Sequence, residues 1–198
     1  MVTEIELKAH VENIEKLEHL LFEKAEFLHM YEKDDCYWVY TGNRPLIPSR
    51  IRIRRETRTF PGGRELSFCL ATYKSKEVQD GVEINQEHEF EVKPAPEFEE
   101  FLKSIGFAPE LSKKKQGRTF FMDGINAELT EVENLGWFVE LELTNSIEGE
   151  PSAETIEKCK QRLFEALDKL GIGREAIESR FYSEMLQHKV AVQEKMLE

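Results

Sequence analysis

Ionisable side chains occupy every second position in at least four short segments of the chain. They are Glu4, Glu6 and Lys8; Arg50, Arg52 and Arg54; Glu87, Glu89 and Glu91; and Glu140 and Glu142. Successive side chains of a β-strand point to opposite faces, so each of these sets lies on one face of its strand. Like charges in a row repel each other unless an opposite charge lies between them. The carboxylates therefore predict a bound cation and the arginines a bound anion, which indicates a site for a metal and a polyanion.

The residues between the charged ones are apolar, as Ile5, Ile53 and Leu141 show. One strand of this kind would ordinarily pack its apolar face on a core and leave its charges in water, because charged side chains are rarely buried. Here several strands share the pattern, with charges of both signs. We therefore expect the charged faces to turn inward and to line a polar tunnel.

The elements that must position these side chains are predicted in α+β order. Strands are expected at about residues 3–10, 35–40, 50–54, 65–74, 87–92, 118–122, 126–132 and 137–143, and amphipathic helices at about 14–21, 97–105 and 156–170. Residues 42–48 are typical of a loop, and residues 61–63 of a hairpin turn. Eight antiparallel strands are about enough to close a barrel around one small ligand. We predict an eight-stranded antiparallel β-barrel that forms a polar tunnel, with flanking helices.

Composition narrows the class of protein. The chain has 198 residues, a size that suits one domain, and its net charge of -12 argues against nonspecific binding to nucleic acid or to an anionic membrane. No stretch approaches the roughly 20 apolar residues that a membrane helix needs. Cys36, Cys69 and Cys159 are far apart, which suits a reducing compartment and gives no zinc site. We expect a cytoplasmic protein that binds neither nucleic acid nor membranes.

Several segments resemble, in order, the motifs of the CYTH superfamily, the triphosphate tunnel metalloenzymes. They are Glu4-Ile5-Glu6-Leu7-Lys8 for E-x-E-x-K, Arg52-Ile53-Arg54 for R-x-R, residues 71–74 for the T-Y-K strand end, Glu87-His88-Glu89 for E-x-E, and residues 135–142 for L-G-x-F-x-E-x-E. Residues 179–186 resemble the S-Y-x-x-L-L ending of the cyclase-like branch. The resemblance covers residues 1–187, a CYTH-like domain, and leaves residues 188–198 as a C-terminal tail.

This resemblance implies a tunnel that holds a triphosphate together with Mg²⁺ or Mn²⁺. Carboxylate oxygens suit such cations, and guanidinium or ammonium groups suit phosphate. The implied metal ligands are Glu4, Glu6, Glu140 and Glu142, with Glu87 and Glu89 as a second metal pair or as partners of the arginines. The implied phosphate-binding residues are Lys8, Arg52, Arg54, Lys74, Lys114 and Arg118. The implied catalytic residues are Glu4, Glu6, Lys8 and Glu140.

Two positions depart from the family pattern. Gln116 stands where the K-x-R strand would have its lysine, so Lys114, or Lys115 if Gly117 hosts a bulge, is expected to supply the charge. Thr130 stands where an aspartate is expected, which removes one carboxylate from the tunnel. Glu128 shares the face of Thr130 and is a candidate replacement.

The same site fits more than one activity. The first expectation is a metal-dependent hydrolase of a triphosphate such as tripolyphosphate, thiamine triphosphate or ATP. The alternative is a class IV adenylyl cyclase that converts ATP to cyclic AMP and pyrophosphate. A third reading, which Thr130 would favour, is a noncatalytic module that binds nucleotide or polyphosphate. A homodimer is expected from the resemblance alone.

Overall fold

The computed structural model describes residues 2–43, 50–144 and 147–197. Its strands are β1 (Val2–His10), β2 (Glu26–Tyr40), β3 (Arg50–Thr59), β4 (Glu65–Gln79), β5 (Val82–Glu91), β6 (Phe107–Met122), β7 (Ile125–Val132), β8 (Gly136–Leu143) and β9 (Ile147–Glu148). Its helices are α1 (Ile14–Lys24), α2 (Ala95–Ser104), α3 (Ala153–Lys169) and α4 (Tyr182–Leu197), with a 3₁₀ turn at Arg174–Ala176. Most of the predicted loop at 42–48 lies outside the described residues.

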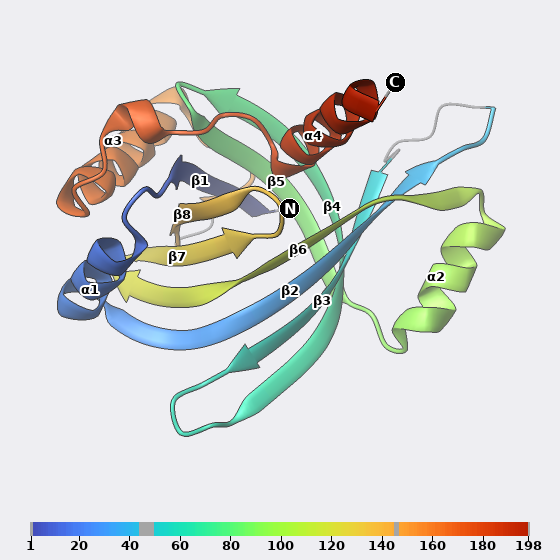
Figure 1. Ribbon diagram of the computed structural model, residues 1–198, viewed down its shortest axis with the longest axis horizontal. Helices are drawn as coiled ribbons and strands as arrows, with labels where there is room; N and C mark the ends of the chain where they lie inside the picture. Colours follow the sequence, from blue (N-terminus) through green and yellow to red (C-terminus); the bar gives the residue numbers. More distant parts are fainter. Residues whose placement is uncertain (1, 44–49, 145–146, 198) are drawn as a thin grey trace.

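Strands β1 to β8 close into one antiparallel barrel, as predicted (Figure 1). Their order around the barrel is β5-β4-β3-β2-β6-β7-β8-β1, and β1 pairs with both β8 and β5. The short β9 adds to β1. Because the barrel is closed, none of these eight strands is a free edge of the sheet, and their inward faces enclose one cavity.

Strands β2 and β6 extend far beyond their predicted bounds. They have 15 and 16 residues and pair along most of their length, from Glu26 opposite Phe121 to Tyr40 opposite Phe107. The sequence predicted only their apolar ends, because the middle of each strand is rich in Lys, Asp and Glu, which have low strand propensity. In the structure these charged residues pair across strands, and the pairing outweighs the propensity.

Two Asp-Gly pairs set the register of the hairpins that carry site residues. Asp80-Gly81 joins β4 to β5 and Asp123-Gly124 joins β6 to β7, and all four residues have φ between 50° and 81°. Positive φ at both central positions is typical of the type I′ turn, whose twist matches that of the flanking strands. These short turns pin the facing positions of each hairpin.

The apolar core lies outside the barrel, between its wall and the helices. Ile5, Leu7 and Leu141 are buried against a cluster that includes Leu21 of α1 and Leu163 of α3. Figure 1 shows α1 and α3 against one side of the barrel and α2 at the far end of the β2–β6 ribbon. The charged residues that alternate with this apolar set must therefore point into the barrel. The inward orientation predicted for them is confirmed.

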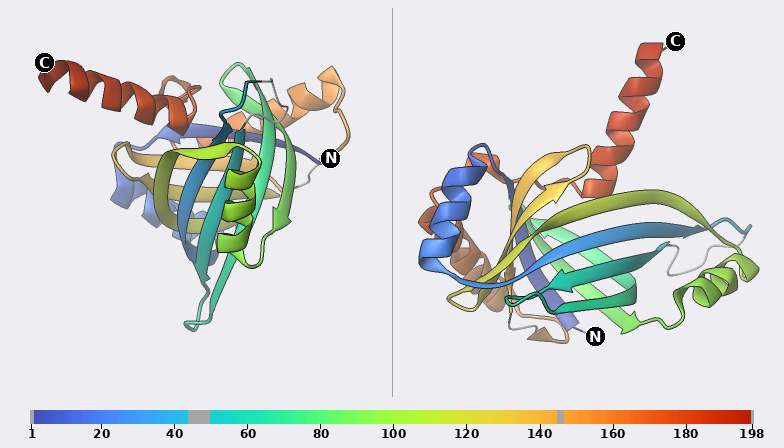
Figure 2. Two further views of the ribbon diagram at one scale, coloured as in Figure 1. Left: turned by 90° about the vertical axis from the view of Figure 1, so that its right-hand side faces the viewer. Right: turned by 60° about the horizontal axis from the view of Figure 1, so that its bottom comes forward.

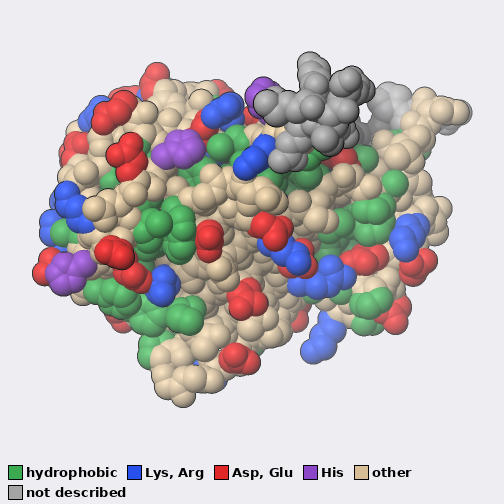
Figure 3. All heavy atoms as spheres, viewed as in Figure 1, with side chains coloured by type: hydrophobic (Ala, Val, Ile, Leu, Met, Phe, Trp, Pro, Cys, Tyr) green, Lys and Arg blue, Asp and Glu red, His purple; other side chains and the backbone are tan. Residues whose placement is uncertain are grey.

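Helix α4 begins at the wall of the barrel and extends away from it (Figure 2). The expected boundary between domain and tail, after Gln187, falls inside this helix. Within the described ranges, no helix has both the length and the apolar content needed to cross a membrane. On the face seen in Figure 3, acidic and basic side chains are interspersed.

Candidate functional site

A cavity of about 680 Å³ occupies the barrel and is bordered by side chains from all eight of its strands. We call it the barrel cavity. Ten basic and nine acidic residues border it. Twelve residues are implied by the family resemblance to bind metal or phosphate or to act in catalysis. Ten of them border the cavity: Glu4, Glu6, Lys8, Arg52, Arg54, Lys74, Glu87, Glu89, Glu140 and Glu142.

The first group of carboxylates lies where β1 meets β8 and β5. Glu6 is directly opposite Glu142, and it accepts hydrogen bonds from Lys74 Nζ (3.0 Å) and from Asn85 Nδ2 (2.7 Å). Burial alone would raise the pKa of Glu6, but Lys74 and Lys76 hold it below its ordinary value. At Glu142, burial followed by repulsion from Glu6 and Glu128 raises the pKa to about 7. Burial and the neighbouring Glu87 raise the pKa of Glu4 to about 9.

The second group of carboxylates lies on β7 and β8. Lys115 Nζ donates to both oxygens of Glu140, at 2.9 and 2.7 Å, and Tyr182 Oη donates to Oε1 at 2.9 Å. Lys33 Nζ donates to both oxygens of Glu128, at 2.7 and 2.9 Å. Burial alone would raise the pKa of each carboxyl, but these lysines hold both pKa values below the ordinary range. The carboxyls of Glu128 and Glu140 are therefore both ionised and paired.

Carboxylates on β5 and β2 hold two of the arginines of β3. Arg52 Nη2 contacts Thr72 (3.0 Å), Glu87 (3.2 Å) and Glu89 (3.4 Å). Thr72 in turn donates to Glu89 at 2.8 Å. Glu87 and Glu89 thus serve as counter-charges of Arg52 in this structure. Arg54, the next inward arginine, donates to Asp35 of β2.

Two lysines share a carboxylate at another corner of the cavity. Lys8 and Lys76 both contact Glu83 of β5. The Lys76 ammonium also lies 3.9 Å from the centre of the Phe181 ring. Lys76 and Glu83 are not among the residues predicted from the sequence, although both continue the alternation of inward residues on β4 and β5.

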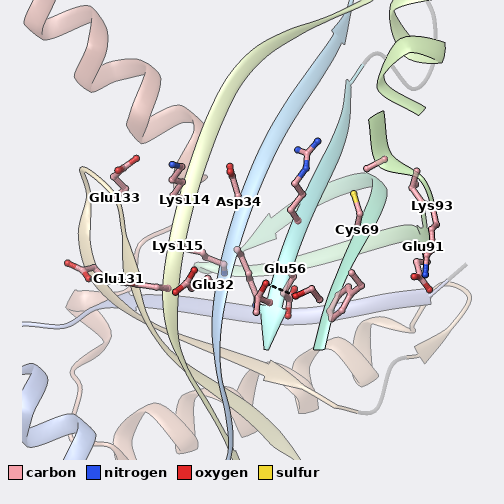
Figure 4. Close-up of a pocket in the computed structure, with 18 residues that line it drawn as sticks. Glu32, Asp34, Glu56, Cys69, Glu91, Lys93, Lys114, Lys115, Glu131 and Glu133 are labelled. Atoms are coloured by element: carbon pink, nitrogen blue, oxygen red, sulfur yellow. Dashed lines mark hydrogen bonds between the residues drawn. The ribbon is translucent and has the colours of Figure 1, made fainter. Parts of the chain in front are cut away.

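Lys114 and Arg118, the other two predicted phosphate-binding residues, do not border the barrel cavity. Strand β6 pairs with β7 in unbroken register from Lys115 to Met122, so Gly117 hosts no bulge. Alternation then turns Lys113 and Lys115 inward. Lys114 stands on the outer wall beside Asp34, in a separate hollow of about 830 Å³ (Figure 4). Arg118 forms an ion pair at 2.9 Å with Glu18 of α1.

The two departures from the family pattern have separate outcomes. Gln116 lies on the outer face, where its amide donates to Glu131 at 2.8 Å, so a lysine there would not have reached the cavity. Thr130 is fully buried and hydrogen-bonded to Tyr31 Oη. Glu128 borders the cavity, as expected for a replacement carboxylate.

The carboxylate oxygens around Glu6 suit a hard divalent cation, both as oxygen ligands and through their negative charge. Glu4, Glu6 and Glu142 offer carboxylate oxygens, and the raised pKa values of Glu4 and Glu142 show carboxyls that lack enough positive charge nearby. Across the described part of the chain, no three His, Cys, Asp or Glu side chains already converge on one point. A cation here would therefore compete with Lys74 for Glu6.

Comparison with known proteins gives one family and a shared fold. The family model of the CYTH domain matches residues 2–182. No curated protein matches the chain. The PH1819 protein of Pyrococcus horikoshii OT3 has a similar structure, with a TM-score of 0.76 and 24% identity over 94% of this chain and 99% of that chain.

Two further solved structures share the fold. One is a proposed adenylate cyclase of Vibrio parahaemolyticus, with a TM-score of 0.71 and 17% identity over 93% of this chain and 97% of that chain. The other is a proposed adenylyl cyclase of Hippeastrum with a dominant triphosphatase activity, with a TM-score of 0.63 and 17% identity over 96% of each chain.

Proposed function

Since the chain belongs to the CYTH family, we propose that it is a metal-dependent enzyme that hydrolyses a triphosphate-containing substrate in the barrel cavity. The observation that carries this proposal is the lining of the cavity, in which cations of β3, β4 and β6 face carboxylates of β1, β7 and β8. Phosphate oxygens would bind the cationic side chains, and a divalent cation would bind the carboxylates.

The balance of charge supports a requirement for metal. Ten basic and nine acidic residues make the lining nearly neutral, so it offers little net attraction to a highly charged anion by itself. A divalent cation that occupied Glu4, Glu6 and Glu142 would release Lys74 for a phosphate. Mg²⁺ or Mn²⁺ supplies charge neutralisation at the phosphate oxygens when bound.

The residues of the chain have distinct parts in this proposal. Arg52, Arg54 and Lys74 hold the phosphates and stabilise the charge that builds on the transferred group. Glu140 and Lys115 remain paired beside them. Water attacks the terminal phosphorus, the bond to the bridging oxygen breaks, and orthophosphate leaves together with the shortened chain.

The aromatic residues at the border of the cavity favour an inorganic substrate. Each of their rings carries a protein cation: Lys76 lies over Phe181 at 3.9 Å, Arg50 over Tyr37 at 4.4 Å, and Lys113 over Tyr182 at 5.2 Å. A nucleobase would have to displace one of these cations in order to stack. Tripolyphosphate requires no such displacement.

A class IV adenylyl cyclase is the second candidate. Its support is the C-terminal segment, whose Tyr182 reaches into the barrel to Glu140, because that segment is the one that resembles the cyclase-like branch. The chemistry would then be attack of the ribose 3′-hydroxyl on the α-phosphorus, with pyrophosphate as the leaving group.

One assay separates these outcomes. The purified protein is incubated with Mg²⁺ or Mn²⁺ and with tripolyphosphate, thiamine triphosphate or ATP, and the products are resolved by anion exchange. We expect orthophosphate, most rapidly from tripolyphosphate. Cyclic AMP with pyrophosphate would establish the cyclase, and tight binding without turnover would establish a noncatalytic module. Glu6→Gln should abolish turnover without unfolding the protein; undiminished turnover in this variant would refute the assignment.

A further inference from the structure

Asp35 is a buried acid that the function proposed above does not use. It lies on β2 and is 0% exposed. A carboxylate so deeply buried needs strong partners, because the free energy of removing its charge from water is high. The cross-strand register supplies them on both sides, since Asp35 is directly opposite Arg54 of β3 and Lys113 of β6.

The contacts of Asp35 are those of a two-sided clamp. Its Oδ1 accepts from Arg54 Nε at 2.7 Å, and its Oδ2 accepts from Arg54 Nη2 at 2.9 Å. The Lys113 ammonium lies 3.0 Å from Oδ2. Burial alone would raise the pKa of Asp35, but these two cations hold it well below its ordinary value. The carboxylate is therefore charged throughout the neutral range.

The clamp leaves part of each cation available to the cavity. A guanidinium has five N–H donors, and the two-point contact with Asp35 uses one on Nε and one on Nη2. The Nη1 donors remain, and both Arg54 and Lys113 border the barrel cavity whereas Asp35 does not. Asp35 thus stands behind these two cations, in the barrel wall.

We propose that Asp35 is a positioning residue for the phosphate site: it fixes the Arg54 guanidinium and the Lys113 ammonium in one orientation toward the cavity and offsets part of their charge. This inference rests on the proposed function, since it assigns the two cations to a phosphate ligand. A guanidinium held in one orientation contributes to turnover because its N–H donors need no reorganisation during the reaction.

Asp35→Asn separates the two effects of the carboxylate. The amide keeps the size of the side chain but leaves Arg54 and Lys113 without a counter-charge, so tripolyphosphate becomes their partner and binds more tightly. Arg54 at the same time loses its fixed orientation. With tripolyphosphate and Mg²⁺ we expect KM to fall several-fold and kcat to fall by at least about tenfold. Partial unfolding would lower kcat while leaving KM unchanged, so the two explanations are distinguishable.

The adjacent Asp34 provides the matched control. Asp34 is exposed on the outer face of the same strand, so Asp34→Asn should leave both constants unchanged. If Asp35→Asn fails to fold, Asp35→Glu keeps the charge and shifts the carboxylate by one methylene. We expect Asp35→Glu to retain KM and to lower kcat. Wild-type kcat in a folded Asp35→Asn or Asp35→Glu variant would overturn the proposal.

A measurement without substrate distinguishes failure of this inference from failure of the proposed function. In the ¹⁵N NMR spectrum, the Arg54 Nε–H should exchange slowly with solvent in the wild type and rapidly in Asp35→Asn. If the wild type neither binds nor hydrolyses tripolyphosphate, the proposed function is wrong. Equal exchange rates in wild type and Asp35→Asn would show that Asp35 does not fix Arg54.

Discussion

At the scale of single residues, the charged side chains of the barrel cavity are held chiefly by one another. Glu6 with Lys74, Glu140 with Lys115 and Lys8 with Glu83 are each predicted or candidate site residues in ion pairs. Buried charges require such partners, so the pairs keep the empty cavity stable. In our proposal a metal takes the place of Lys74 at Glu6 and a phosphate binds the released Lys74, while Glu140 and Lys115 stay paired.

Lys114 and Lys115 are adjacent in sequence and point to opposite sides of the wall, which makes them a matched pair. Lys115→Met leaves Glu140 with Tyr182 as its remaining partner, and we expect turnover of tripolyphosphate to fall by about a hundredfold. The free energy of unfolding should fall by about 3–5 kcal/mol, because a buried carboxylate loses its cation. Lys114→Met should change neither property. Steady-state kinetics and urea unfolding of both variants give the comparison, and equal effects would contradict the register of β6.

The pKa of Glu142 predicts a dependence of metal binding on pH. Its carboxyl is protonated below about pH 7 and cannot then coordinate a cation. Ionisation of Glu142 should therefore contribute a rise of about tenfold in Mn²⁺ affinity between pH 6 and pH 8. Glu4, whose pKa of about 9 keeps it protonated in the metal-free protein over this range, should add a further rise. Calorimetry at several pH values follows the total. Glu142→Gln should weaken binding and remove the tenfold contribution of Glu142, leaving the contribution of Glu4. An unchanged rise in Glu142→Gln would assign the proton to another group.

The same carboxyl has an opposite effect on the stability of the metal-free protein. A folded-state pKa above the unfolded value means that the folded state binds the proton more tightly. The contribution of Glu142 to stability is therefore largest below pH 4.5 and is lost as the pH rises to about 7. Addition of Mn²⁺ at pH 8 should restore it, and thermal unfolding with and without the ion tests this.

At the scale of elements, β6 depends on a glycine at its centre. A Cβ on Gly117 would lie 2.2 Å from the Leu129 carbonyl oxygen and 2.8 Å from Tyr31 Oη. Gly117→Ala must therefore displace the β7 backbone or the Tyr31 side chain, and we expect a loss of about 1–3 kcal/mol in unfolding free energy. Ser112→Ala, at an exposed position of the same strand, is the control. Equal urea midpoints for the two variants would be inconsistent with this packing.

The sequence predicted the barrel because alternation is a property of one strand at a time. Glu4, Glu6, Arg52 and Arg54 could be placed inward from their own strands alone. Lys113 and Lys115 could not, because three consecutive lysines leave two possible faces and the choice depends on pairing with β7. The family motif left open Lys114, on the face of Arg118, and Lys115, of which only Lys115 borders the barrel cavity.

Asp35 was missed for a related reason. The predicted strand began at residue 35, so the alternation of Tyr31, Lys33, Asp35 and Tyr37 along β2 was not visible as one pattern. Its role also depends on Arg54 and Lys113, which are far away in sequence and are brought together by the register of three strands. A residue whose function is set by partners on both neighbouring strands needs the folded structure to be found.

At the scale of the whole molecule, the barrel has a polar interior and an apolar outer layer. This arrangement is stable because α1 and α3 cover the apolar side and the ion pairs satisfy the polar side. The surplus of acid that gives the net charge of -12 lies outside the nearly balanced cavity. The surface therefore repels anions in general, and the cavity is the place where cations are concentrated for a phosphate.

The start of α4 completes the wall at one place, which predicts different results for two truncations. Tyr182 is buried, packs edge-on against Phe138 with ring centres 5.0 Å apart, and donates to Glu140. A chain that ends at Arg180 loses these contacts and exposes Phe138 and Val132, so we expect about 3–5 kcal/mol lower stability and strongly reduced turnover.

A chain that ends at Gln187 keeps Tyr182 and the buried Leu186. It should retain the stability and kcat of the full chain, because the part of α4 that extends away from the barrel contributes no group to the cavity lining among the described residues. Thermal unfolding and tripolyphosphate turnover of both truncated chains are compared with those of the full chain. Full activity in the chain ending at Arg180 would show that the barrel cavity is complete without Tyr182. Loss of activity in the chain ending at Gln187 would instead place a functional contact in the projecting part of α4.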